Sequence, residues 1–243
     1  MADAKDFHLQ LNKDENIRLF LALAEQMKTP LMRASRTAEL ARMTQDTAKL
    51  EEIEYITDLG IDLIESYILS LRLQTAGDEI PLESVSLSAT LNDVAHTLQK
   101  LHYASSFDIE LHIAGKYGPI MAHPAGLRVA LVNIGKALMT SHTEREQAVR
   151  PVLKLTARKT QRGIAAGIFT NINGLDATNF TKARKLYGSV MQPLPQLTSE
   201  SGAGIFIADS LLHTMSSNIR VSHYKKMTGL AATFMPSQQL ALV

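Results

Sequence analysis

The chain has 243 residues, of which 45% are hydrophobic and 20% are charged. This length and balance are typical of a globular protein with a real hydrophobic core, built as one large domain or two small ones. The formal net charge of +1 gives no whole-chain electrostatic reason to expect a nucleic-acid partner. The chain contains no cysteine, which excludes disulfides, thiolate metal sites and a cysteine nucleophile.

The first twelve residues are polar and contain no apolar stretch typical of a signal peptide. No segment approaches the roughly 20 apolar residues that a membrane helix requires. We therefore expect no membrane segment and a cytoplasmic location, either as a whole protein or as the cytosolic part of a larger one. We expect an N-terminal tail over residues 1–15, a helical domain over 16–76 and a second domain over 82–243.

Residues 16–43 follow a seven-residue repeat. Its two apolar rows are Ile17, Ala24, Leu31 and Ala38, and Phe20, Met27, Ala34 and Ala41. Rows spaced in this way predict a helix with one apolar face, the seam of a coiled coil or helix bundle. Asp14 is the expected N-cap, and Pro30 is expected to kink the helix without ending it.

A second apolar helix is expected from about residue 47 to residue 74, which completes a helical hairpin. Two helices cannot bury both apolar faces alone, so a homodimer that forms a four-helix bundle is one solution. An antiparallel helix pair packed on the rest of the molecule is the other.

The turn-rich residues 75–81 predict the domain boundary. Beyond it, strands are expected over 82–87, 109–113, 152–158, 164–171, 219–222 and 230–235. Helices are expected over 88–103, with Ser88 as N-cap, and over 124–141 and 204–215. The turn at 161–163 predicts an antiparallel hairpin. Helices that cover one face of a mixed sheet, in an α+β fold, fit this order best.

Residues 23–31 resemble the dimerisation and phosphoacceptor motif of sensor histidine kinases, Ser-His-Glu-Leu-Arg-Thr-Pro-Leu. Lys28, Thr29, Pro30 and Leu31 match in place and spacing. The phosphoacceptor histidine falls on Glu25, and the acidic residue after it falls on Gln26. The heptad pattern independently predicts that Glu25 projects to solvent, because it follows the seam residue Ala24.

The second domain is similar, more distantly, to the ATP-binding domain of the same family. Asn133 matches the first asparagine of the family's asparagine motif, whereas Ala137 replaces the second, which helps to hold magnesium. Asn171 or Asn173 replaces the adenine-reading aspartate, and Gly174 remains from that motif. Gly202 and Gly204 match the phosphate loop, and Phe206 replaces its last glycine. The resemblance covers residues 16–236 and implies a helical hairpin followed by an α/β sandwich of the histidine-kinase ATPase type.

These substitutions bear directly on the chemistry that the family carries out. Autophosphorylation requires an imidazole nucleophile at position 25, which glutamate does not supply. Ala137 removes a magnesium ligand, and the missing aspartate removes a charge-assisted hydrogen bond of roughly 1.5–3 kcal/mol. We therefore expect a degenerate kinase without autokinase activity. We also expect no cofactor, and binding of ATP and magnesium is doubtful. The glycines at 202 and 204 either bind an anion or merely form a turn.

The favoured function is a two-component signalling module that binds a response-regulator receiver domain or a partner histidine kinase. Glu25, Lys28, Thr29 and Leu31 are the expected contact residues. A phosphatase of phosphorylated receiver domains is the first alternative, with Glu25, Gln26 or Thr29 placing the attacking water. An ATP-binding switch that transfers nothing is the second, and it rests on Gly202 and Gly204. The scattered histidines predict no metal site, and the basic cluster at Lys182, Arg184 and Lys185 predicts a solvated helix face.

Overall fold

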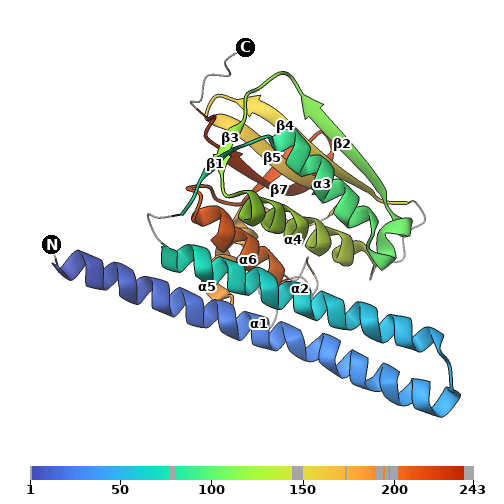
Figure 1. Ribbon diagram of the computed structural model, residues 1–243. Helices are drawn as coiled ribbons and strands as arrows, with labels where there is room; N and C mark the ends of the chain where they lie inside the picture. Colours follow the sequence, from blue (N-terminus) through green and yellow to red (C-terminus); the bar gives the residue numbers. More distant parts are fainter. Residues whose placement is uncertain are drawn as a thin grey trace.

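The computed structural model describes residues 2–76, 80–143, 150–172, 174–189, 194, 197 and 202–237. A long helical hairpin lies along one side of a domain in which helices cover one face of a β-sheet (Figure 1). The expected α+β architecture, a helical hairpin followed by an α/β sandwich, is thus confirmed. Within the described ranges, no helix combines the length and apolar character that crossing a lipid bilayer would require.

The hairpin consists of α1 (Ala2–Thr44) and α2 (Ala48–Ala76). Its turn is closed by Asp46, whose Oδ1 accepts a hydrogen bond from the Ala48 amide at 3.0 Å. The expected tail over residues 1–15 was wrong, because α1 already begins at Ala2 and Asp14 lies inside it instead of capping it. Residues 2–15 contain neither glycine nor proline, so nothing in that stretch interrupts the helix. The same helix passes through Pro30.

The five-stranded sheet has the order β2-β4-β5-β7-β6. Its strands are β2 (Asp108–Ala114), β4 (Val152–Thr160), β5 (Gly163–Thr170), β7 (Met227–Phe234) and β6 (Arg220–Tyr224). The β2–β4 pair is parallel and the other three pairs are antiparallel, which includes the expected β4–β5 hairpin. A separate small sheet pairs β1 (Glu83–Val85) with β3 (Ile120–Ala122), a strand that the sequence did not predict.

Two helices of the second domain, α3 (Leu87–Gln99) and α4 (Pro124–Thr143), contact the inner face of the sheet, and α6 (Gly202–His213) packs against α4. Ser86, not Ser88, caps α3, because its side chain accepts a hydrogen bond from the Ala89 amide. A short 3-10 helix (His102–Ser106) follows α3, and α5 (Ala177–Leu186) begins at its N-cap Asp176. The 3-10 helix was not predicted, whereas α5 carries the basic cluster that the sequence placed on a helix face.

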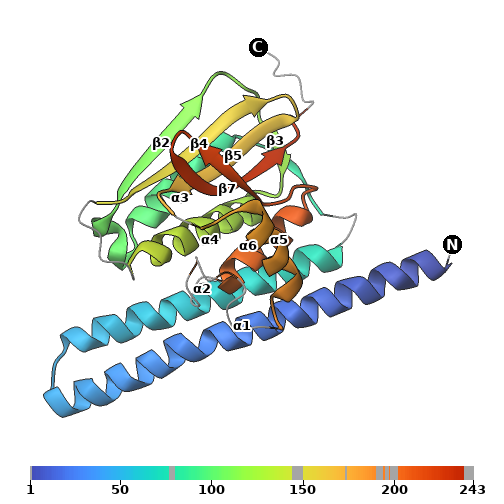
Figure 2. The same cartoon turned by 180° about the vertical axis from the view of Figure 1, so that it is seen from behind.

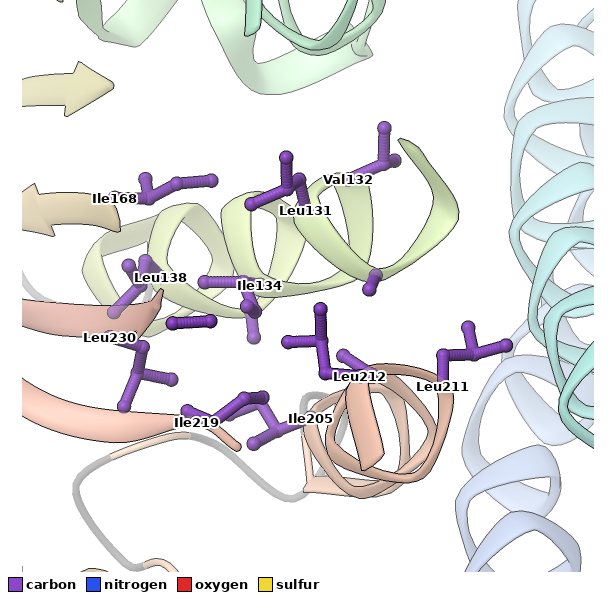
Figure 3. Packing of buried hydrophobic residues seen from close by; sticks show 14 of the residues in the cluster. Leu131, Val132, Ile134, Leu138, Ile168, Ile205, Leu211, Leu212, Ile219 and Leu230 are labelled. Atoms are coloured by element: carbon purple, nitrogen blue, oxygen red, sulfur yellow. The ribbon is translucent and has the colours of Figure 1, made fainter. Parts of the chain in front are cut away.

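Helix α6 lies between α4 and the hairpin (Figure 1). In close-up, Ile134 of α4 faces Ile205 and Leu212 of α6, whereas Leu131 points away from α6 (Figure 3). Leu211 extends from the opposite side of α6 toward the hairpin (Figure 3). Helix α6 is buried on nearly all sides. A hairpin side chain that contacts its N-terminus therefore links the hairpin to the core of the second domain.

Candidate functional site

Glu25, at the position of the phosphoacceptor, lies on the exposed surface of α1. Its Oε1 accepts a hydrogen bond from Nζ of Lys28, one turn further along, at 2.6 Å. The side chains of Glu25 and Lys28 are 46% and 64% exposed, so this ion pair contributes little to stability. The carboxylate is therefore accessible to a partner from solvent, as the heptad pattern predicts.

Thr29 and Leu31 are also exposed, Leu31 to 62%. Residues three or four apart are neighbours on a helix, so Lys28 lies next to both Glu25 and Leu31. The four residues form one continuous exposed strip, which we call the α1 strip: Glu25, Lys28, Thr29 and Leu31. It combines one carboxylate, one ammonium, one hydroxyl and one large apolar group.

Gln26 points away from this strip, into the contact with the second domain. Its Oε1 accepts a hydrogen bond from the backbone amide of Ala203 at 2.6 Å. Ala203 is the second residue of α6, where backbone amides have no partner within the helix. The side chain of one domain thus caps the glycine-flanked helix start of the other.

The rest of the hairpin contact continues along α6 and α4. Ser210 of α6 is within hydrogen-bonding distance of both Ser70 and Gln74 of α2, and the Ser70–Ser210 oxygens are 2.8 Å apart. Lys136 of α4 donates to Asp62 of α2 at 2.6 Å. A Cβ placed on Gly204 would lie 3.8 Å from the Leu63 side chain of α2. The hairpin therefore covers the start of α6, the segment matched to the phosphate loop.

Asn133 and Ala137 lie one turn apart on α4, and both are buried. Asn133 is only 6% exposed, and its Nδ2 has no hydrogen-bond partner among the described residues. A Cβ on Gly204 would lie 3.8 Å from Asn133 Cβ, so α4 and α6 bring these two predicted residues together. Ala137 offers no oxygen to a metal ion at the position where the family supplies one.

The segment after β5 contains the residues matched to the family's adenine-binding motif. Asn171 is exposed, and Asn173 lies outside the described residues. Gly174 has a φ of 80°, a left-handed conformation that glycine adopts without strain, and its carbonyl accepts a hydrogen bond from Asn179 at 3.3 Å. Gly174 therefore shapes the entry into α5.

Three apolar side chains within and just before α6 are buried. Leu194 and Leu197, between α5 and α6, are buried in the main core. Phe206, which replaces the last glycine of the phosphate loop, is buried and stacks on Tyr187 with ring centroids 4.4 Å apart.

Arg184 has a role that the sequence did not indicate. Lys182 and Lys185 are exposed, as expected for a solvated face, but Arg184 is half-buried. Its guanidinium donates to both oxygens of Asp209, at 2.6 and 2.5 Å, and to the Ile219 carbonyl at 2.7 Å. This network ties α5, α6 and the start of β6 together, and no local pattern reveals it because its partners are distant in sequence.

Tyr187 and Gly188 follow α5 and contact the N-terminal half of α1. Burial, with a further contribution from the Glu15 carboxylate, raises the pKa of Tyr187 well above its usual value near 10. The Tyr187 hydroxyl lies 3.4 Å from Glu15 Oε1. A Cβ on Gly188 would overlap the carbonyl group of Arg18, so the two backbones are in direct contact.

No family model matches this sequence, and no curated protein sequence matches it. Solved structures do match. The histidine kinase AdeS of Acinetobacter baumannii is similar over 87% of this chain and 97% of its own, with a TM-score of 0.59 and 10% identity. Full-length ShkA in complex with AMPPNP is similar over 79% of this chain and 40% of its own, with a TM-score of 0.55 and 16% identity.

The chain therefore has the fold of a histidine kinase core, in which a helical hairpin precedes an ATPase-like domain. The sequence motifs and the structural similarity indicate the same architecture.

Proposed function

We propose that this chain is a histidine-kinase-like signalling protein without autokinase activity, which binds a receiver domain or a partner histidine kinase through its hairpin. The observation that carries the proposal is the α1 strip. It is accessible and lies where kinases of this fold present their phosphoacceptor, yet it offers a carboxylate in place of an imidazole. A surface of this composition suits recognition better than phosphate transfer.

The interior supports the same proposal. The residues present do not fit a nucleotide with magnesium, since Ala137 supplies no ligand and Leu194, Leu197 and Phe206 are buried in the core. Gln26 already satisfies the Ala203 amide, one of the donors that a phosphate would use at this helix start. We therefore infer that the ATPase-like domain supports the hairpin structurally.

The hairpin is further proposed to form a homodimer. Large apolar side chains outside the α1 strip remain exposed on both helices: Ile17 and Phe20 on α1, and Leu50, Ile61, Ile64 and Ile68 on α2. Soluble monomers rarely leave a contiguous apolar surface of this kind uncovered. A second copy that packs the same faces together would complete a four-helix bundle.

The direct test is titration calorimetry of the purified protein with each receiver domain of its source cell. We expect one receiver to bind, and expect Thr29→Arg and Leu31→Glu each to weaken that binding at least tenfold. Met235→Glu, on the second domain and 74% exposed, is the matched control and should leave binding unchanged. Binding that survives both α1 variants, or no binding to any receiver or kinase, would contradict the proposal.

A phosphatase remains the second candidate, since Thr29 and Glu25 are exposed in the α1 strip. Gln26 is a poorer candidate for holding the attacking water because its Oε1 is engaged by Ala203. The test compares the decay of a phosphorylated receiver with and without the protein. Acceleration that Thr29→Ala abolishes would establish this activity, and an unchanged decay rate would exclude it.

The buried Nδ2 of Asn133, which has no hydrogen-bond partner among the described residues, adds support to the ATP-binding switch. Calorimetry with ATP and magnesium addresses it. We expect no heat at millimolar nucleotide, and micromolar binding that Asn133→Ala removes would revive this alternative.

A further inference from the structure

The outer face of the β-sheet, opposite the helices, forms a groove that the proposed function does not use. In Figure 2 the strands lie in front of α3, which belongs to the covered face. The groove has a volume of about 460 Å³, within the range of roughly 300–1,000 Å³ of small-molecule sites. It is lined by residues of β4, β5, β6, β7 and the β4–β5 turn.

The floor of the groove is formed by small side chains, which leave space above the strands. Gly167 of β5 is paired in register with Thr156 of β4 and Ala231 of β7. Ala165, two residues along β5, lies opposite Thr233. A Cβ on Gly167 would lie 2.8 Å from Ala231 Cβ, so even alanine there would disturb the floor.

Aromatic side chains close one end of the groove. Phe169 covers Gly167, and its ring centroid lies 5.6 Å from that of Tyr224 on β6. The Tyr224 hydroxyl oxygen is in turn 2.5 Å from Nδ1 of His112 on β2. Strands β2 and β6 are the opposite edges of the sheet, about 19 Å apart if it were flat. Side chains that meet across this span indicate a strongly concave face.

Three arginines surround the other part of the groove: Arg158 on β4, Arg162 in the turn and Arg220 on β6. In the register of the sheet, Arg158 and Arg220 lie on opposite sides of the small-residue floor. All three are exposed. Their guanidinium groups are therefore placed to reach one ligand from two sides.

These arginines have no acidic partner in the part of the chain that the structure describes. No described carboxylate forms an ion pair with any of them, and none of the residues lining the groove is acidic. Two basic residues at the β2–β4 edge are paired instead: Lys154 with Glu110 at 2.6 Å, and Arg150, just before β4, with Asp108 at 3.2 Å. Three unpaired charges above a concave floor attract an anion, and arginine suits phosphate and carboxylate oxygens in particular.

We propose that this groove binds a small molecule that carries at least two anionic groups, phosphate or carboxylate. The anionic groups contact Arg158 and Arg220 from opposite sides, and the body of the ligand lies over Gly167 and Ala231. The groove lies on the face of the sheet away from the α1 strip, so the proposal stands independently of the hairpin's partner.

The test uses the full chain, with tripolyphosphate and citrate as probes, in titration calorimetry and amide NMR at low salt. We expect binding that shifts the Gly167 and Ala231 amides and leaves the Ala203 amide unchanged. Arg158→Gln and Arg220→Gln should each weaken it at least tenfold, because each removes a charged hydrogen-bond donor. Lys182→Gln, an exposed change of equal charge on α5, should have little effect.

The two probes separate the possible sources of the anion. Stronger binding of tripolyphosphate identifies a phosphorylated ligand, and stronger binding of citrate identifies a polycarboxylate. Neither probe binding, shifts at Ala203 instead, or equal weakening by Lys182→Gln would overturn the proposal. So would binding of a glutamate-rich octapeptide when both small anions fail, because the site would then be a protein-docking surface. Because the arginines are exposed, the variants should fold normally. Thermal unfolding midpoints equal to that of the wild type provide this control.

Discussion

Gly188 shows how one residue holds the two parts of the molecule together. Its φ of 74° is left-handed, and its Cα hydrogen faces the backbone of Arg18 on α1. Any side chain would meet that backbone and not a flexible group. Gly115 provides a natural comparison, because it has a φ of 84° but a Cβ added there would meet no atom within 4 Å.

We predict that Gly188→Ala destabilises the protein clearly more than Gly115→Ala. Both changes introduce left-handed strain of about 1–2 kcal/mol. Only Gly188→Ala adds overpacking against α1, typically about 1–3 kcal/mol. Urea unfolding followed by circular dichroism gives the comparison, and equal losses for the two variants would contradict the close α1 contact.

Tyr187 predicts how stability depends on alkaline pH. Burial raises the pKa of Tyr187 in the folded state above its value near 10 in the unfolded chain. The folded state therefore holds this proton more tightly, and stability is full below pH 10 and falls as the pH rises above it, by up to about 1.4 kcal/mol per pH unit. Tyr67 and Tyr117 have pKa values raised by burial in the same direction.

The corresponding measurement is urea unfolding of the wild type and Tyr187→Phe between pH 8 and pH 11. The wild type should lose stability above pH 10, and Tyr187→Phe should lose less over the same interval. The difference between the two curves isolates this tyrosine from other alkaline titrations. Parallel curves would show that Tyr187 is not buried against α1.

At the scale of elements, the start of α6 is stabilised from outside its own domain. A helix begins with amides that lack intrahelical partners, and here the side chain of Gln26 on α1 accepts from one of them. This contact joins the Ser70–Ser210 and Lys136–Asp62 contacts as part of a polar connection between the hairpin and the ATPase-like domain. Loss of the hairpin contact should therefore destabilise the start of α6 first.

We predict that Gln26→Ala lowers the free energy of unfolding by about 0.5–1.5 kcal/mol, the usual net value of one hydrogen bond. Gln26→Glu should retain the stability or raise it slightly, because a carboxylate accepts the same bond and is favoured near a helix N-terminus. Hydrogen exchange of the Ala203 amide provides a local readout and should accelerate in Gln26→Ala only. Unchanged exchange in that variant would contradict the cap.

At the scale of the whole molecule, the hairpin is only half covered. One side of α1, with Leu19 and Leu23, is buried against the rest of the chain. The row that begins at Ile17 and includes Leu31 faces solvent, although the heptad pattern predicts it to lie in a seam. A second copy would cover Ile17 and Phe20 of α1 together with Ile64 and Ile68 of α2, leave the α1 strip accessible, and need no new backbone structure.

We predict a dimer by light scattering, with twice the mass of the single chain. The double variant Ile64→Glu and Ile68→Glu should be a monomer, because it buries two carboxylates in the proposed seam. Met235→Glu changes an exposed apolar residue of the second domain and should remain dimeric. A monomeric wild type at high protein concentration would instead favour the single helix pair.

The sequence determined the features that depend on local patterns. The seven-residue rows predict the hairpin, the turn at residues 161–163 predicts the β4–β5 pair, and the order of motifs predicts the histidine kinase fold. Polar and apolar periodicity is a property of neighbouring residues, so it can be read without knowing the fold. The same reasoning placed Glu25 on the exposed surface.

The tertiary structure decided everything that depends on residues far apart in the chain. The cap on Ala203 comes from Gln26, the partner of Arg184 is Asp209, and the arginine groove gathers four strands and a turn. The true cap of α3 at Ser86 and the early start of α1 differ from the expectation, because several residues in each segment were equally suitable locally. Which candidate is used, and which charges remain unpaired, is settled only when distant elements pack against each other.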